Sequence, residues 1–298
     1  MSAPPPRTLS VMHVTTVAAS LRFLRGQAGF MRTRGIELSA MCSPSDELER
    51  FGRDEGIDVT GVPMTRAITP LLDLVALPRL VRVMRRERPD IVHAHTPKGG
   101  LLGMIAATLA GVPVRIYHLR GLRLMGVQGP TRALLAALER LSCALATDVL
   151  CVSHSVRSIV VEQGLCPAPK IRVLLEGSGQ GLDGLGRFDP STVSHTDAAA
   201  ARAELGIPPE ALLFGFVGRL VREKGVEELT RAWQRARLDL PDAHLLLVGP
   251  AEPHDPIAAE HLRALEGDPR VTMIGFSEDT PRLYAAMDVV VLPTYREG

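Results

Sequence analysis

The sequence predicts an α/β protein made of two successive halves, each with a parallel sheet covered by helices. Short apolar runs alternate with longer segments of helical periodicity along the chain, which is the pattern of βαβ units. Some runs, such as D-V-L-C-V-S at Asp148–Ser153, are apolar almost throughout, as strands buried on both faces of a sheet are. The length of 298 residues also suits two domains of roughly 150 residues each.

The first half contains seven of the predicted strands. They are expected at Leu9–Val14, Ile36–Met41, Asp58–Val62, Ile91–His95, Val114–His118, Val149–Ser153 and Ile171–Leu174. Helical periodicity separates them at Leu21–Arg34, Leu71–Arg88, Leu101–Leu109 and Arg132–Leu145.

The stretch from Glu176 to Ala199 interrupts this alternation. It contains G-S-G-Q-G, Pro190 and several Ser, Thr and Asp residues, and it shows little apolar periodicity. We therefore predict a first domain over residues 1–178, a linker over 179–200 and a second domain over 201–298.

The second half contains four predicted strands, at Leu212–Val217, His244–Val248, Val271–Gly275 and Val289–Leu292. Its helices are expected at Gly225–Ala236, Pro256–Leu265 and Thr280–Met287. No helix follows the last strand in the sequence, so we expect the second domain to be incomplete.

The composition excludes several classes of protein. The net charge of +1 gives no global field that would favour nucleic acid. The N-terminus M-S-A-P-P-P-R-T lacks the apolar stretch of a signal peptide, and the uncharged run Gly99–Val114 is shorter than the about 20 residues of a membrane span. The four cysteines show no C-x-x-C spacing, which favours buried, reduced thiols in a cytoplasmic protein: Cys42, Cys143, Cys151 and Cys166.

The stretch F-V-G-R-L-V-R-E-K-G, Phe216–Gly225, indicates a ligand site. A predicted strand ends at Val217, Gly218 permits a tight turn, and Arg219 and Lys224 precede a predicted helix. Ligands of open α/β sheets bind beyond the carboxyl ends of the strands, and two cations near a helix N-terminus suit a diphosphate. A solvated loop whose cations face water remains the alternative from spacing alone.

Motifs in both halves resemble those of the retaining glycosyltransferases of family 4, which have the GT-B fold. They are P-D-I-V-H-A-H-T-P-K-G-G-L-L-G at Pro89–Gly103, V-L-C-V-S-H-S at Val149–Ser155, G-R-L-x-x-x-K-G at Gly218–Gly225, L-L-L-V-G at Leu245–Gly249, G-F at Gly275–Phe276 and P-T-Y-R-E-G at Pro293–Gly298. The first two look like those of the capsule and lipid-linked-oligosaccharide branch. The resemblance covers essentially the whole chain and implies two Rossmann-like domains that face each other across a cleft.

The resemblance also implies roles for residues of the second half. Arg219 and Lys224, with Gly218 in the turn before them, would hold the diphosphate of a nucleotide-sugar donor and stabilise the charge on the leaving group. Glu297 would be the first glutamate of an E-x7-E motif beside the transferred sugar, and Gly298 would begin a loop whose N–H groups hold that sugar. We expect a UDP-sugar as co-substrate, with neither a cofactor nor a metal.

In the first half, relatives carry an H-G pair after the strand that begins here at Val114. The corresponding sequence is Y-H-L-R-G, so Arg120 aligns with that histidine, and His118 lies two residues earlier on the same side of a strand. Either side chain could act in the site. A plain strand-end role for His118 is the alternative.

The stretch H-A-H-T-P-K-G-G predicts an anion site on the acceptor side. Thr96 can cap a helix with Pro97 in its first turn, while Lys98 and Gly99 would supply a cation and backbone N–H groups. An ordinary capped helix with an exposed lysine is the alternative.

Two histidines in this stretch raise the question of a metal. His93 and His95 share one face of a predicted strand, but the sequence shows no third ligand at suitable spacing. We therefore expect no metal site.

The loop after the first strand supplies further candidates. Relatives present this loop to the donor phosphates, and here it offers the hydroxyls of Thr15, Thr16 and Ser20, of which Thr16 is our donor-side candidate. Arg22 and Arg25 are expected at the start of the following helix, where they could face the acceptor.

Five arginines between Arg79 and Arg88 lie on a predicted amphipathic helix. Basic amphipathic helices bind anionic membrane surfaces, whereas the usual alternative is a solvated helix face. With a lipid-linked acceptor, we expect a cytoplasmic protein that contacts the inner face of the plasma membrane.

These observations predict a retaining hexosyl or N-acetylhexosaminyl transferase of surface polysaccharide or glycolipid biosynthesis. It would move a sugar from a UDP-sugar to a glycan or polyprenyl-diphosphate-linked acceptor. One alternative is an inactive truncated fragment of such an enzyme. The other is a GT-B nucleotide-sugar epimerase, which would require paired acid and base groups around the sugar.

Overall fold

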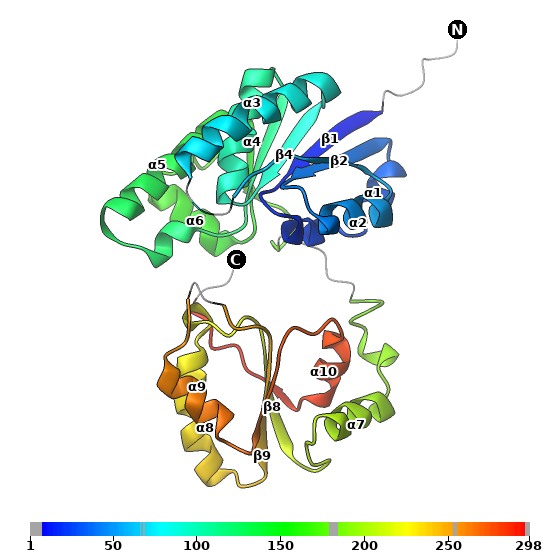
Figure 1. Ribbon diagram of the computed structural model, residues 1–298, viewed down its shortest axis with the longest axis vertical. Coiled ribbons are helices and arrows are strands. Elements are labelled where there is room, and N and C mark those ends of the chain that lie inside the picture. Colours follow the sequence, from blue (N-terminus) through cyan, green and yellow to red (C-terminus); the bar gives the residue numbers. More distant parts are fainter. Residues whose placement is uncertain (1–7, 66, 68, 179–183, 253–254, 296–298) are drawn as a thin grey trace. The chain divides into compact units, whose positions relative to one another are not determined.

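The computed structural model describes residues 8–65, 67, 69–178, 184–252 and 255–295. The chain divides between residues 181 and 182 into two compact units. Both are α/β layers, and each is described by itself (Figure 1). Among the described helices, none combines the length and apolarity that a bilayer crossing demands.

The first unit is built on a seven-stranded parallel sheet in the order β3-β2-β1-β4-β5-β6-β7. Its strands are β1 (Leu9–Val14), β2 (Ile36–Cys42), β3 (Asp58–Gly61), β4 (Ile91–His95), β5 (Val114–Leu119), β6 (Asp148–Cys151) and β7 (Ile171–Val173). All seven predicted strands are confirmed, with ends that differ by at most two residues. The order changes direction at β1 and β4, so the carboxyl ends of these neighbours form the part of the sheet where ligands of such folds bind.

Helices cover both faces of this sheet (Figure 1). One layer holds α3 (Pro70–Glu87), α4 (Pro97–Ala110), α5 (Gly129–Leu145) and α6 (His154–Glu162). The other holds η1 (Ala18–Leu24), α1 (Gln27–Arg32) and α2 (Asp46–Glu55), and the short helix η2 (Arg123–Gly126) follows β5. Glycines bring α4 close to the strands, because a Cβ atom on Gly100 would lie only 2.1 Å from the Tyr117 ring.

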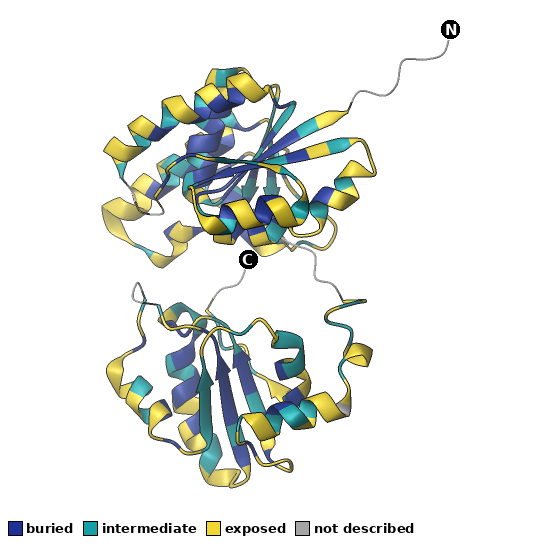
Figure 2. Ribbon diagram, turned by 45° about the vertical axis from the view of Figure 1, so that its right-hand side comes forward, coloured by how far each residue is buried: buried dark blue, intermediate teal, exposed yellow. Residues whose placement is uncertain are grey.

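The second unit contains a four-stranded parallel sheet in the order β10-β9-β8-β11. Its strands are β8 (Leu212–Val217), β9 (Ala243–Val248), β10 (Val271–Ile274) and β11 (Val289–Val290). One face packs on α8 (Val226–Asp239) and α9 (Ala259–Glu266), the other on α7 (His195–Glu204) and α10 (Thr280–Ala286). The buried residues follow the strands of both sheets (Figure 2), as expected where helices cover both faces.

The buried side chains confirm the expectation for the cysteines. All four cysteines are free and buried: Cys42, Cys143, Cys151 and Cys166. Trp233 lies in the core between α8 and the sheet, where its indole N–H donates to Asp268 Oδ2 over 2.9 Å.

The structure corrects several predicted elements. The expected helix Leu21–Arg34 is broken into η1 and α1, because Gly26 between them has a φ of 75° and ends the first segment. Helix η3 (Pro190–Thr192) and the start of α7 were not predicted and fall inside the range 179–200. Ser194 and Asp197 form a capping box at α7, a start signal within the polar stretch. Helices α2 and α6 were not predicted.

Candidate functional site

Two glycines shape the carboxyl edge of the four-stranded sheet. Gly218 follows β8, and its N–H donates to the carbonyl of Val248 in β9 over 2.8 Å. Gly249 follows β9 with a φ of 145°, and a Cβ atom there would lie 1.9 Å from the carbonyl oxygen of Gly218. The two strand ends therefore lie in backbone contact, which holds the start of the G-R-L-x-x-x-K-G stretch in a fixed position.

The rest of this stretch forms a short helix followed by α8. Helix η4 (Arg222–Lys224) is capped by Asp255, whose carboxylate accepts from the Glu223 N–H over 2.8 Å. Lys224 is half-buried at its end. Gly225 then adopts a φ of 71° and leads into the first turn of α8.

The segment after β11 packs on this turn. A Cβ atom on Gly225 would lie 2.0 Å from the carbonyl oxygen of Pro293. The Tyr295 N–H donates to the carbonyl oxygen of Glu223 over 3.1 Å. Two motifs that lie far apart in the sequence thus meet at one edge of the sheet, whereas Glu297 and Gly298 lie outside the described residues.

Two carboxylates hold the guanidinium of Arg219. It donates to Glu252 over 2.8 Å and to Glu223 on η4. Burial opposes the charge, but the hydrogen bonds and charges of Glu252 and Glu223 outweigh it and raise the pKa of Arg219. The side chain remains partly exposed and is therefore a charged, oriented donor at the carboxyl edge.

The first sheet carries a second polar edge, at the ends of β1 and β4. Thr96 caps α4 as predicted: its hydroxyl accepts from the Gly99 N–H over 3.3 Å, and Pro97 occupies the first turn. The hydroxyl of Thr16 lies 2.9 Å from that of Thr96. Thr96 has a φ of 66°, an unfavourable value for a β-branched residue, so this cap is held under backbone strain.

Lys98 is engaged within the first unit. Its ammonium forms an ion pair with Asp73 over 2.6 Å and donates to the Ala67 carbonyl over 2.6 Å and to the hydroxyls of Thr65 and Thr69. Only 13% of the side chain is exposed. These contacts tie the start of α4 to the first turn of α3 and to the segment before it, and they use the donors of Lys98 that an anion would need.

Four imidazoles and one guanidinium gather on the face of the first sheet opposite α4. His13 on β1 is in register with His93 on β4, and His95 on β4 is in register with His118 on β5. His13 Nδ1 lies 2.9 Å from His95 Nε2, and His93 Nε2 lies 3.2 Å from His118 Nδ1. Arg120 Nε donates to His95 Nδ1 over 3.2 Å.

Burial keeps these imidazoles neutral. It lowers the pKa of His13 to about 3 and that of His118 to about 4, and the charge of Arg120 adds to both shifts. The pKa values of His93 and His95 are also well below the usual range, mainly through burial. Burial lowers the pKa of Arg120 to about 10, which leaves it charged at neutral pH. His118 and Arg120 both belong to this cluster, as the prediction that they lie on the same side of the strand requires.

The remaining candidates lie on η1 and after it. Arg22 is exposed on η1 and lies 3.4 Å from Glu47 of α2. Arg25 is exposed just after η1, so neither begins an α-helix as predicted.

Three residues that the structure places beside the candidates were not predicted from the sequence. The expectation that no third ligand accompanies His93 and His95 is wrong, because one ligand atom from each of these residues and His13 lies within 4.8 Å of the others. The register of β1 against β4 brings His13 there, and strand order cannot be read from the sequence. Glu252 and Glu223 were also missed; Glu223 lies four residues after Arg219, a spacing that could have indicated the pair.

Comparisons with known proteins identify the family. Residues 20–177 match a family model described as Glycosyl transferase 4-like domain, and residues 211–298 match one described as Glycosyl transferases group 1. The capsular polysaccharide biosynthesis glycosyltransferase CapM of Staphylococcus aureus is 31% identical to this chain, over 97% of this chain and 73% of CapM. The UDP-Gal:alpha-D-GlcNAc-diphosphoundecaprenol alpha-1,3-galactosyltransferase of Escherichia coli is 27% identical, over 88% of this chain and 67% of that protein.

The fold agrees with this result. The crystal structure of Anabaena HepE in complex with UDP-glucose matches with a TM-score of 0.72 and 20% identity, over 96% of this chain and 74% of that one. A likeness at this level of identity shows a shared fold. The chain belongs to the family 4 glycosyltransferases and has their GT-B fold.

Proposed function

We propose that this protein transfers a sugar from a UDP-sugar to a polyprenyl-diphosphate-linked acceptor, with retention, in the synthesis of a bacterial surface polysaccharide. The observation that carries the proposal is the contact between the Gly218–Gly225 stretch and Pro293–Tyr295 at the carboxyl edge of the second sheet. This edge presents Arg219 as an oriented cation where ligands of such sheets bind. The names of CapM and of the E. coli galactosyltransferase support a surface glycan and a lipid-linked acceptor.

In this proposal the diphosphate of the donor binds to Arg219 and Lys224. As the bond to the sugar breaks, negative charge grows on the leaving diphosphate, and fixed cations stabilise it without rearranging at that moment. Glu223 and Glu252 orient Arg219 before the donor arrives and share its donors afterwards. Glu297 and Gly298 are proposed to contact the transferred sugar, and Thr16 to lie on the donor side.

The first unit is proposed to bind the acceptor. His118 and Arg120 are the candidates for a part in the sugar transfer itself, and Gly99 at the start of α4 is an acceptor-side candidate. Arg22 and Arg25 are exposed and can meet an anionic acceptor. Lys98 contributes through the position of α4, because Asp73 and its neighbours occupy its ammonium group.

Transfer to a defined lipid acceptor tests this function. The chain would be incubated with individual UDP-sugars and vesicles that contain undecaprenyl-diphosphate N-acetylglucosamine, and products would be analysed by mass spectrometry and by NMR for the anomeric configuration. We expect an α-linked product from one UDP-sugar. Binding of UDP without turnover would support the inactive-fragment alternative, and epimerised free donor would support the epimerase. An inverted linkage would contradict retention.

The surface of α3 supports a membrane contact in the same proposal. The first two turns expose four apolar side chains, Leu71, Leu72, Leu74 and Val75, and Leu71 is 80% exposed. Four arginines follow on the exposed side of the helix: Arg79, Arg82, Arg85 and Arg86. The two carboxylates of α3 are paired, Asp73 with Lys98 and Glu87 with Arg86. We propose that this face docks on an anionic bilayer, with the apolar turns inserted and the arginines at the phosphates.

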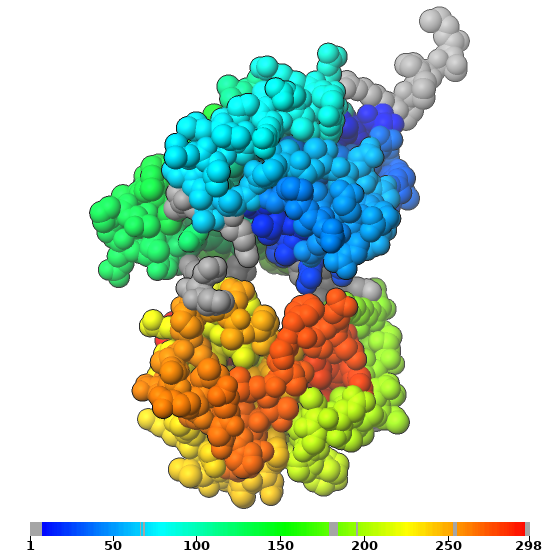
Figure 3. Space-filling view, viewed as in Figure 1, coloured from blue at the N-terminus to red at the C-terminus, as the bar shows by residue number. Residues whose placement is uncertain are grey.

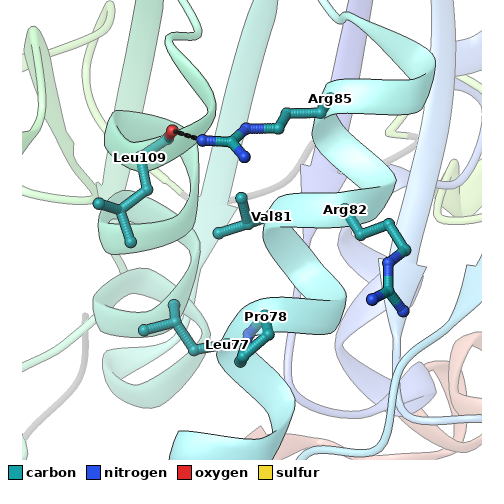
Figure 4. Close-up of a pocket in the computed structure, with 6 residues that line it drawn as sticks. All are labelled: Leu77, Pro78, Val81, Arg82, Arg85 and Leu109. Atoms are coloured by element: carbon teal, nitrogen blue, oxygen red, sulfur yellow. Dashed lines mark hydrogen bonds between the residues drawn. The ribbon is translucent and has the colours of Figure 1, made fainter.

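The surroundings of α3 fit this contact. The helix lies on the surface of the first unit, in light blue to cyan in the space-filling view (Figure 3). A shallow pocket between α3 and α4 is lined by Leu77, Pro78, Val81, Arg82, Arg85 and Leu109 (Figure 4). Arg85 reaches across it to the carbonyl oxygen of Leu109 over 2.9 Å. Apolar walls and two guanidinium groups suit the chain and the phosphate of one anionic lipid.

A further inference from the structure

The cluster formed by His13, His93 and His95 contains a donor set that sugar transfer does not require. Each of the three residues offers one ring nitrogen, and these atoms lie within 4.8 Å of one another. They come from two neighbouring strands in register, so the backbone of the sheet fixes their spacing. We infer that these three histidines form a binding site for one divalent transition-metal ion, such as Zn²⁺, Ni²⁺ or Co²⁺.

The shortest of these distances suits such an ion. Zn²⁺ binds imidazole nitrogen at about 2.0–2.1 Å, so two ligands 2.9 Å apart subtend an angle of about 90° at the metal. Separating His13 Nδ1 and His95 Nε2 by a few tenths of an ångström would open this angle toward the tetrahedral value. His93 supplies the third nitrogen. Two ligands of one Zn²⁺ ion lie at most about 4.1 Å apart, so the rings must draw together from a spacing of up to 4.8 Å when the ion binds. The three ligands are neutral nitrogen donors, which borderline metals prefer and which Mg²⁺ and Ca²⁺ do not.

The hydrogen bonds also fix the tautomers of two ligands. Arg120 can only donate, so His95 Nδ1 accepts and the proton of His95 lies on Nε2. That N–H donates to His13 Nδ1, and the proton of His13 therefore lies on Nε2. This Nε2 atom is buried and has no partner among the described residues, a cost that a purely structural network would avoid. His13 already holds the tautomer in which Nδ1 can bind a metal.

Metal binding and the contact between Arg120 and His95 exclude each other. A metal at His95 Nε2 moves the ring proton to Nδ1, where it faces the N–H of Arg120, and two donors cannot share a hydrogen bond. The ion also adds positive charge beside the guanidinium. Occupation of the site therefore breaks the contact between Arg120 and His95, and Arg120 is a candidate catalytic residue. The site goes beyond the proposed transfer reaction and would inhibit that reaction if Arg120 takes part in it.

The test uses the full chain without an affinity tag and without any sugar substrate. Zn²⁺ binding would be measured by calorimetry and Co²⁺ binding by visible absorption. We expect one ion per chain, at least about tenfold weaker binding in His13→Asn and His95→Asn, and unchanged binding in His154→Asn, whose histidine is exposed on α6. Arg120→Gln should bind the ion several-fold more tightly. Thermal unfolding would check that each variant is folded.

X-ray absorption of the Zn²⁺-loaded wild-type chain decides the matter if the buried His13 variant does not fold. Three imidazole ligands would support the site. Fewer than three, or binding that survives His95→Asn, would overturn it. Unchanged affinity in Arg120→Gln would overturn the antagonism with Arg120. None of these readouts depends on transferase activity, so failure here is distinct from failure of the proposed function.

Discussion

The carbonyl oxygen of Pro293 lies against the Cα atom of Gly225, 2.0 Å from the position that a Cβ atom would take. We expect Gly225→Ala to lower the free energy of unfolding of the second unit by more than about 2 kcal/mol, because the left-handed conformation and the collision both oppose alanine. Urea denaturation followed by circular dichroism measures this. Gly206 is the matched control: its φ of 68° is similar, but no atom lies within 4 Å of its Cβ position. Gly206→Ala should cost only about 1 kcal/mol, and equal losses would contradict the importance of the Pro293 contact.

Arg219 and its two carboxylates allow a test of donor binding. Arg219→Gln should weaken UDP binding about 10- to 100-fold, since hydrogen bonds to charged groups contribute about 1.5–3 kcal/mol. Arg222→Gln on the neighbouring, more exposed position should change it little. Glu252→Gln should bind UDP at least as tightly as wild type, because one carboxylate no longer competes with the phosphates. Calorimetry with UDP measures all three, and unchanged binding in Arg219→Gln would remove Arg219 from the donor site.

Lys98 and Asp73 form a pair that is mostly buried, and a double-mutant cycle measures its contribution. Lys98→Met and Asp73→Asn should each reduce the free energy of unfolding by about 1–3 kcal/mol, because each leaves a desolvated partner. The double variant should lose less free energy of unfolding than the two single variants lose together, because the ion pair is lost only once. Strict additivity would show that the contact does not stabilise the protein. If Asp73→Asn raises the KM for the lipid acceptor as much as Lys98→Met does, Lys98 acts through the position of α4.

Glu139 makes stability depend on pH. Burial raises its pKa from 4.5 to about 7, against the effect of the Tyr117 hydroxyl that donates to it over 2.8 Å. The unfolded chain loses this proton first as the pH rises, so the folded state is progressively destabilised between about pH 4.5 and 7, by up to roughly 3 kcal/mol. Glu139→Gln should therefore stabilise the protein at pH 8 and have little effect at pH 4.5. The melting temperature across this range measures the difference, and parallel curves for wild type and variant would contradict it.

The membrane contact of α3 predicts two separable effects on vesicle binding. Replacing Arg79, Arg82 and Arg86 by glutamine should reduce partition to phosphatidylglycerol vesicles about 100-fold, at about 1 kcal/mol per charge. Replacing Leu71 and Leu74 by serine should reduce the part of vesicle binding that remains at high salt concentration. Salt screens the exposed charges, but it does not weaken the insertion of apolar side chains. The control replaces the exposed Arg50 and Arg53 of α2. If the α3 variant and the α2 control lose vesicle binding equally, or if the protein binds neutral vesicles equally well, the result would favour a solvated helix face. Dimers that form with increasing protein concentration, without vesicle binding, would favour a second copy of the chain as the partner.

The strands could be predicted from the sequence because helices cover both faces of each sheet. The run Leu212–Val217, for example, is apolar throughout and is followed by Gly218, so both of its boundaries were predicted correctly. The helices could be predicted less completely than the strands. The start of α7 lies in a polar stretch whose periodicity is weak, and only its capping box marks it. The break at Gly26 depends on one backbone conformation that apolar spacing does not report.

The candidate site was predictable where its residues are close in the sequence. Arg219, Lys224 and the cap at Thr96 follow from local spacing. The contact of Pro293 with Gly225, the register of His13 with His93 and the tether of Lys98 to Asp73 each join segments far apart in the chain. These contacts depend on which strands become neighbours. In a parallel sheet the crossover connections determine the strand order, and no local sequence pattern reports it.

The placement of the cysteines and the tryptophan gives each unit its own intrinsic reporter of unfolding. All four thiols belong to the first unit, and burial raises the pKa of Cys42 to about 12, so alkylating reagents should reach them only when that unit opens. The single tryptophan belongs to the second unit, so its fluorescence follows that unit alone. Thiol labelling and fluorescence on one unmodified sample would therefore show whether the two units unfold as one cooperative system or in succession.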